Sequence, residues 1–74
     1  MSVKTATKLV REGDLVAEVE VQLHEEEHGW APYLSLEDAN RLDDVRDALR
    51  SGDVDRAATL ASRVYRLTPL TTAR

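Results

Sequence analysis

The spacing of apolar residues between Leu36 and Leu49 constrains the fold of this chain more than any other feature. Five apolar residues recur there at intervals of three and four: Leu36, Ala39, Leu42, Val45 and Leu49. This spacing predicts an amphipathic α-helix with one buried stripe. Ser35 can cap its start, with Asp38 three residues later as in a capping box, and Gly52 can follow its last turn.

Two strand candidates precede this helix, residues 3–11 and 15–24, and residues 12–14 join them. The second candidate alternates apolar and polar side chains, which is the period of a half-buried strand. A three-residue loop would place Lys8 opposite Glu18 on the outer face of a hairpin. A two-residue turn would place Lys8 opposite a valine, so the sequence favours the three-residue loop.

The remainder of the chain predicts a second helix and a third strand. Asp53 can cap a helix over residues 54–63, and residues 64–67 alternate again, with Tyr65 and Leu67 expected to face inward. The whole pattern predicts an α+β fold in the order ββααβ, in which two helices pack on one face of a small antiparallel sheet.

Length and composition make this a single small domain. We expect it to cover residues 1–70, followed by a flexible tail over residues 71–74. A chain of 74 residues with one Trp, two Tyr and no Phe has little material for a core. A homodimer is therefore expected, because a second copy would add apolar burial.

Charge and cysteine content narrow the class of protein. The net charge is -4, but all 14 acidic residues lie between Glu12 and Asp55, and the lysines and most arginines lie toward the two ends. The absence of cysteine excludes a disulfide scaffold and a thiolate metal site, and agrees with a reducing cytoplasm. No apolar run approaches the length of a membrane span. We therefore expect a cytoplasmic protein with no membrane partner.

The segment His24 to His28 satisfies the His-Glu-x-x-His pattern of zinc peptidases. That pattern needs a helix, whereas this segment follows a predicted strand and precedes Gly29. In an extended chain, residues four apart are separated by about 13 Å, too far to share one metal ion. We therefore predict no metal site, no cofactor and no catalytic residues, and a metal-dependent hydrolase remains the alternative from another class.

Two further features are candidates for binding a partner. Trp30 and Tyr33 either fix the start of the helix on the sheet or form an exposed aromatic anchor of the kind enriched in interfaces. The predicted helix also carries an acidic face, on which Glu37, Asp44 and Asp47 are the residues expected to contact a basic protein. The same acids could instead be a solvated face in which neighbouring arginines pair with them.

Nucleic-acid binding is a third hypothesis. The two predicted helices around Gly52 could form a helix-turn-helix, with residues 54–63 as the recognition helix. That helix would offer only Arg56 and Arg63, and it follows an acidic segment that would repel phosphate. The basic N- and C-terminal strands of a dimer are the more suitable surface, and nucleic acid is not the expected partner.

Residues 33–70 also carry a resemblance. Three motifs in this segment are similar to those of short, mostly uncharacterised bacterial proteins. They are the Tyr-Leu-Ser-Leu-Glu-Asp-Ala start at Tyr33, the Gly-Asp break at Gly52 and the Val-Tyr-x-Leu-Thr-Pro ending at Val64. Some of these proteins lie beside toxin genes and look antitoxin-like. The resemblance implies a non-enzymatic interaction module that masks a basic partner, and it brings no catalytic motif with it.

Overall fold

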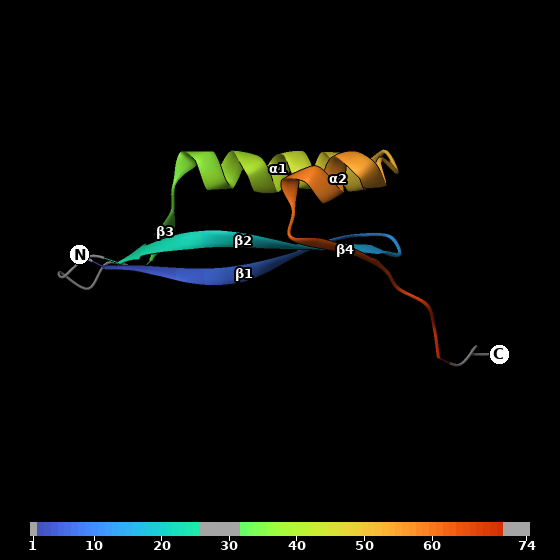
Figure 1. Ribbon diagram of the computed structural model, residues 1–74, viewed down its shortest axis with the longest axis horizontal. Helices are drawn as coiled ribbons and strands as arrows, with labels where there is room; N and C mark the ends of the chain where they lie inside the picture. The colour runs from blue at the N-terminus through green and yellow to red at the C-terminus, as the bar shows by residue number, and fades with distance from the viewer. Residues whose placement is uncertain (1, 26–31, 71–74) are drawn as a thin grey trace.

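The computed structural model describes residues 2–25 and 32–70. It has two layers, a sheet and a pair of helices that cover one face of it (Figure 1). Along the chain the elements are β1 (Ser2–Glu12), β2 (Leu15–Glu25), β3 (Tyr33–Leu34), α1 (Leu36–Arg50), α2 (Val54–Leu60) and β4 (Arg63–Arg66). The predicted α+β fold is confirmed, and the structure adds the two-residue strand β3 before the first helix.

The register of the β1–β2 hairpin differs from the predicted one. Glu12 pairs with Leu15, so the turn has two residues, Gly13 and Asp14, and Lys8 lies opposite Val19. Gly13 has a φ of 62°, and within the described ranges only glycines have a positive φ. Glycine at the first central position of a two-residue turn is typical of type II′, whose twist matches that of the flanking strands. The prediction of a three-residue loop was wrong.

The position of β1 explains why this register is tolerated. β1 is an edge strand, and its helix-facing side buries only Val10, while Ala6 is half-buried and Lys4 and Lys8 are exposed. A lysine at an edge can extend past the helix layer into water, so it need not face another charge. Leu9 lies on the uncovered face instead, with 68% of its surface exposed.

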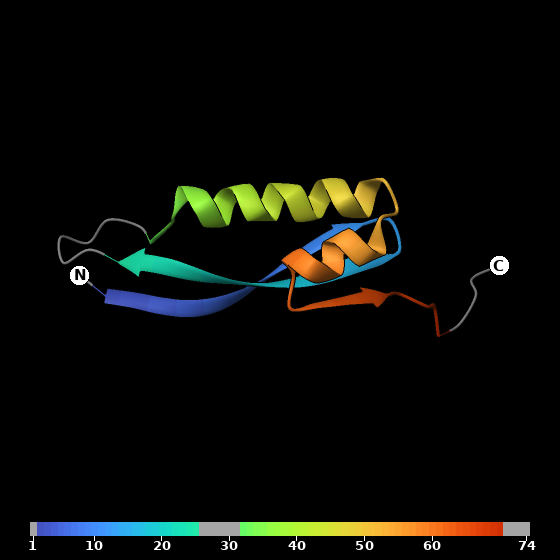
Figure 2. The ribbon, with the colours of Figure 1, turned by 45° about the horizontal axis from the view of Figure 1, so that its top comes forward.

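β2 is the central strand of the sheet. β1 pairs with it along its whole length on one edge, and β3 and β4 pair with its two ends on the other edge. Figure 2 shows α1 lying along the sheet and the shorter α2 beside β4. The basic first and last strands are thus separated by β2 and do not form one basic region.

The core lies between β2 and the helices. Its nine buried residues are all apolar: Val10, Leu15, Ala17, Val19, Val21, Val45, Ala48, Leu49 and Ala57. The odd-numbered residues of β2 supply four of them, as the period of two predicts. Of the predicted stripe on α1, Val45 and Leu49 are buried, whereas Leu36 is 76% exposed. Leu36 lies nine residues before Val45, and at about 3.6 residues per turn these two side chains leave opposite sides of the helix. Within the described residues, neither helix is long and apolar enough to cross a membrane.

The predictions for the C-terminal third are partly wrong. α2 ends at Leu60, three residues before the predicted end, and β4 begins at Arg63. In β4 the residue that faces the helices is half-buried Val64, which pairs with buried Ala17, so Tyr65 lies on the uncovered face with 41% of its surface exposed. Leu67 is also 42% exposed. The alternating pattern was correct, but the face assigned to it was not.

The cap of α1 gives a direct test of the local helix signal. The Ser35 hydroxyl accepts a hydrogen bond from the Asp38 N–H at 3.1 Å. Ser35→Ala removes this acceptor, and we expect a loss of about 1 kcal/mol in the free energy of unfolding, measured by urea denaturation. Ser35→Asn, which keeps a capping oxygen, should retain most of that stability. Equal stability of Ser35→Ala and the wild type would contradict the role of the cap.

Candidate functional site

The outward face of α1 carries three of the predicted partner-binding residues. Glu37, Asp44 and Asp47 are exposed, and their spacings of seven and three residues place them along one side of the helix. We call these three residues the acidic stripe. Asp43 is exposed next to it. The Asp47 Oδ1 atom lies 3.8 Å from Arg50 Nη1, so this end of the stripe is partly neutralised.

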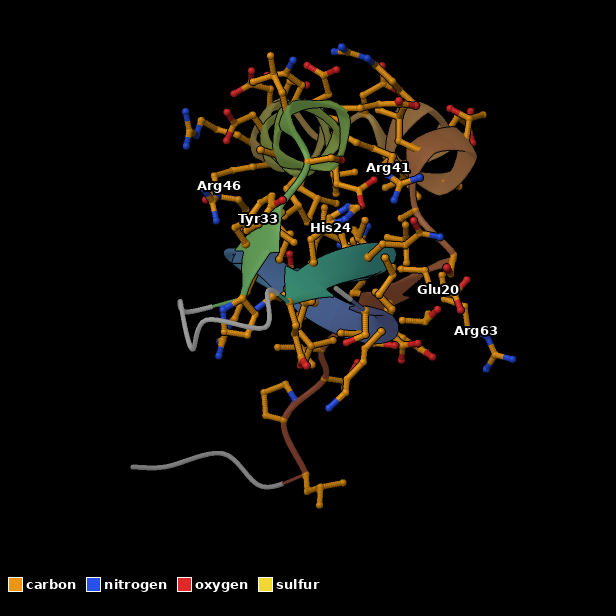
Figure 3. The ribbon with its side chains drawn as sticks, turned by 90° about the vertical axis from the view of Figure 1, so that its left-hand side faces the viewer. Glu20, His24, Tyr33, Arg41, Arg46 and Arg63 are labelled. Atoms are coloured by element: carbon orange, nitrogen blue, oxygen red, sulfur yellow. The ribbon has the colours of Figure 1, made fainter. Side chains whose placement is uncertain are left out.

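The other charges of α1 are arranged so that its arginines approach the sheet. Arg46 Nε lies 3.9 Å from Glu12 Oε2, and Arg50 Nε lies 3.6 Å from Glu12 Oε1. Arg41 extends on the opposite side of α1 from Arg46 (Figure 3) and pairs with Asp38, with 3.1 Å between Nη2 and Oδ1. Among the described residues, none of these arginines pairs with Glu37. Only one of the ion pairs expected from local spacing, the one to Asp47, is present.

Asp38 and Arg41 occupy a gap in the sheet. Between the ends of β3 and β4, no strand of the described residues lies beside the second edge of β2. Asp38 Oδ2 accepts a hydrogen bond from the Gln22 N–H at 2.9 Å, and Arg41 Nη2 donates to the Glu20 carbonyl. We call Asp38 and Arg41 the edge clamp. Their side chains replace the missing strand by satisfying backbone groups that would otherwise be unpaired.

Sequence reasoning missed the edge clamp. It placed Arg41 on the solvated side of the helix, whereas the structure has it half-buried beneath α1. The available signal was weak. Asp38 and Arg41 lie next to the buried stripe and are three residues apart, but ordinary surface ion pairs on a helix have the same spacing. The gap that they fill depends on where two distant strands end, which no local pattern contains.

A pocket of about 430 Å³ opens at this gap between α1 and β2. Glu20, Glu37 and Asp38 line it with carboxylates, and Arg41 is the cation among its lining residues. The Arg41 Nε atom is buried and has no hydrogen-bond partner among the described residues. Because Glu37 belongs both to the pocket and to the acidic stripe, the negative charge is continuous from the outer face of α1 to the edge of the sheet.

The aromatic candidates lie elsewhere. Tyr33 is in β3, opposite His24 of β2, and the two rings stack with centroids 5.4 Å apart. Even-numbered residues of β2 point away from the helices, so Tyr33 lies on the uncovered face of the sheet and is 46% exposed. It therefore does not share a face with the acidic stripe. Trp30 lies outside the described residues, so its predicted role stays a prediction.

The His-Glu-x-x-His segment does not begin on a helix. His24 is in β2 and is half-buried against Tyr33, and His28 lies outside the described residues. At His24 the backbone is extended, so the helical spacing on which the zinc-peptidase pattern depends is missing at its first ligand. Within residues 2–25 and 32–70, no three His, Asp or Glu side chains are grouped as a metal site would require.

Three of the five basic residues of β1 and β4 lie beside acids or a hydroxyl. Lys4 Nζ lies 3.3 Å from Glu25 Oε1, and Arg66 Nη1 lies 3.1 Å from Asp14 Oδ2. The Tyr65 hydroxyl, and after it the charge of Glu18, raise the pKa of the Arg63 guanidinium further above its ordinary value. These three cations are held beside acids or a hydroxyl and are spread over the sheet.

The predicted recognition helix for nucleic acid is also altered. α2 has only seven residues, and Arg63 belongs to β4 instead of the helix. Of the two arginines expected on that helix, only Arg56 remains there. The predicted bounds of the recognition helix were therefore wrong, and a two-turn helix with one arginine offers little to a DNA groove. Nucleic-acid binding itself stays a hypothesis.

Comparison of the chain with protein-family models, with curated proteins and with solved structures finds no match. The resemblance of residues 33–70 to short bacterial proteins thus stays a prediction from the motifs. What can be said of function comes from the surfaces of the chain itself, and the acidic stripe adjoins a pocket that Glu20, Glu37 and Asp38 line with carboxylates.

Proposed function

We propose that this chain is a non-enzymatic, cytoplasmic protein-interaction module that binds a basic protein through the acidic stripe of α1. The residues expected to make the contact are Glu37, Asp44 and Asp47. An antitoxin-like role, in which the chain masks a basic partner, is the specific form of this function that the resemblance implies.

One observation carries the proposal: the acids of the acidic stripe face outward, and only Asp47 among them has an arginine of α1 beside it. Among the described residues, Arg41 pairs with Asp38, and Arg46 and Arg50 both pair with Glu12. Of the acidic stripe, only Asp47 has one of these arginines, Arg50, within 4 Å. A helix whose charges served only to stabilise it would be expected to pair them along its own surface. Unpaired surface charge of one sign instead favours and steers association with a partner of the opposite sign.

The acidic stripe can be tested with the immobilised chain and a lysate of the organism that encodes it. The triple variant Glu37→Gln, Asp44→Asn, Asp47→Asn should lose about ten- to hundredfold in affinity for a basic protein that the wild type captures at a fixed ratio. This range corresponds to a few tenths to 1 kcal/mol for each exposed charge pair. The affinity for the purified partner, measured by calorimetry, should also fall as salt is raised.

A matched control changes the same amount of charge away from α1. Asp14→Asn, Glu25→Gln and Asp55→Asn alter acids of the sheet and of α2, and this variant should bind as the wild type does. Equal capture by both triple variants would refute the role of the acidic stripe. So would a captured partner that is acidic, or whose binding does not depend on salt.

A further inference from the structure

The outer edge of β1 is the longest strand edge that has no partner among the described residues. β1 has 11 residues, about twice the usual strand length, and pairs with β2 without a bulge from Ser2 to Glu12. It contains no proline, and no other described element pairs with its second edge. Val3 and Leu9 on its uncovered face are 50% and 68% exposed. Edges of this kind are templates for the addition of another strand.

The backbone groups available at this edge follow from the pairing inside the chain. Glu18 and Gln22 of β2 make backbone hydrogen bonds of 2.8 and 2.9 Å on the side away from β1. Their partners across the ladder, Leu9 and Thr5, therefore direct their own N–H and C=O groups away from β2. By the same alternation, all odd-numbered residues of β1 present free groups at the outer edge: Val3, Thr5, Thr7, Leu9 and Arg11.

The surface area indicates that this chain is large for a monomer. It exposes 5636 Å² at a mass of 8.3 kDa, whereas a monomeric protein of that mass exposes about 4,600 Å². Its radius of gyration is 14.9 Å, compared with about 11 Å for a domain of this length. Part of this surplus of roughly 1,000 Å² belongs to the hairpin, where Val3 and Leu9 of β1 are 50% and 68% exposed, and part to the extended segment after β4, where Leu70 is fully exposed.

We propose that β1 pairs antiparallel with β1 of a second copy, in a register centred on Thr7. Only the odd-numbered residues of β1 carry N–H and C=O groups at the outer edge, so an odd-numbered residue of one copy must pair with an odd-numbered residue of the other. This condition places the two-fold axis where one residue faces its own copy. A register centred on Ala6 sets Lys4 against Lys8 of the second copy, and one centred on Lys8 sets two lysines against each other. Like charges directly opposite are unfavourable, so both are disfavoured.

The register centred on Thr7 avoids these contacts and uses the whole edge. Thr7 faces its own copy, Thr5 faces Leu9, and Val3 faces Arg11, so every odd-numbered residue of β1 gains a bonded partner. On the helix side, Lys4 faces Val10 and Lys8 faces Ala6 of the second copy, so no lysine lies directly opposite another; the diagonal neighbours of Lys4 are Glu12 and Lys8 of the second copy. The interface is therefore self-complementary, as a two-fold dimer requires.

The resulting dimer would have one continuous sheet. A two-fold axis perpendicular to the sheet keeps the helices of both copies on the same face. The edge that becomes paired is on β1, whereas the acidic stripe is on the outer side of α1, so the dimer and the proposed partner surface do not compete. Dimerisation can be tested independently of any partner.

Sedimentation velocity over a wide range of concentration gives the first test. The wild-type chain should shift from monomer to dimer as concentration rises, and Thr7→Pro should stay monomeric over the same range. Because the Thr7 N–H faces the free edge, proline there removes intermolecular bonds and leaves the β1–β2 ladder intact. Thr7→Val keeps the N–H and should dimerise like the wild type. A monomeric wild type, or a Thr7→Pro dimer, would overturn the proposal.

Disulfide cross-linking tests the register without depending on whether the proline variant folds. The chain contains no cysteine, so a single introduced cysteine can react only with its copy. At the two-fold axis the Cα atoms of residue 7 would lie about 5.5 Å apart, within the range of a disulfide. Thr7→Cys should therefore form a covalent dimer on mild oxidation.

Thr5→Cys is the matched control for the register. Its copy would lie about 13 Å away along the strand, so it should cross-link much more slowly than Thr7→Cys. A mixture of Thr5→Cys and Leu9→Cys should form the mixed disulfide, since these residues face each other in the proposed pairing. Equal rates for Thr5→Cys and Thr7→Cys, or no mixed product, would show that the register is wrong.

Discussion

Leu49→Ala is expected to lower the free energy of unfolding by about 2 to 5 kcal/mol, which is the usual cost of removing a buried leucine side chain. Leu49 is 2% exposed and lies in the core among residues of α1, β1 and β2. That core contains three alanines among its nine residues, so little apolar area remains to compensate for a cavity. In a domain of this size each kcal/mol shifts Tm by about 4 to 8 °C, so the variant should melt at least about 8 °C lower.

Leu36→Ala is the control for this prediction. Leu36 belongs to the same predicted stripe and the same helix, but 76% of its surface is exposed. Its replacement should change stability by less than about 0.5 kcal/mol. Equal losses for Leu36→Ala and Leu49→Ala would mean that the first turn of α1 packs against apolar surface, and the assignment of the core would have to change.

The contrast between these two leucines marks the limit of the periodic pattern. The spacing of three and four residues correctly predicted α1 and the burial of Val45 and Leu49, because those properties depend on neighbours along the helix. Successive steps of three residues drift around the helix, because three residues are less than one turn. Leu36 is nine residues from Val45 and therefore leaves the opposite side of α1, where it is 76% exposed. Ala48 is buried although the pattern had not included it.

The hairpin shows a second limit of the same kind. Both long strands were predicted within two residues of their observed ends, since alternation is a local property. The register was wrong because the cross-strand comparison treated both faces of β1 as if each were fully buried or fully exposed. Lys8 faces the helix side and is still exposed. An edge strand relaxes the rule that opposite residues agree in character.

The candidate site was predictable only in part. The acidic face of α1 follows directly from helical spacing, and Glu37, Asp44 and Asp47 are exposed there. Grouping Tyr33 with them failed to anticipate β3, which turns that side chain to the uncovered face of the sheet. The edge clamp and the gap that it fills were missed because they require three-dimensional knowledge of two strand ends that are far apart in the sequence.

Asp38→Ala is expected to lower the free energy of unfolding by about 1.5 to 3 kcal/mol. The substitution leaves the Gln22 N–H without its acceptor at 2.9 Å and removes the partner of Arg41 at 3.1 Å. Loss of a hydrogen bond to a charged group, together with an unpaired backbone donor at the sheet, accounts for this range. Amide exchange measured by NMR should accelerate at Gln22 more than at neighbouring residues of β2, because the Gln22 N–H then lacks its acceptor.

Glu37→Ala separates this effect from general electrostatics at the helix start. Both acids lie in the first turn of α1, so both interact favourably with the helix dipole, but Glu37 makes no hydrogen bond to the sheet among the described residues. Its replacement should cost less than about 1 kcal/mol and leave the exchange of the Gln22 amide unchanged. Arg41→Ala should be strongly non-additive with Asp38→Ala, since the two side chains act on the same gap. Additive losses for Asp38→Ala and Arg41→Ala, or equal effects of Asp38→Ala and Glu37→Ala, would contradict this role. The edge of β2 would then be stable without the edge clamp, and a strand of a partner could pair with it at the pocket.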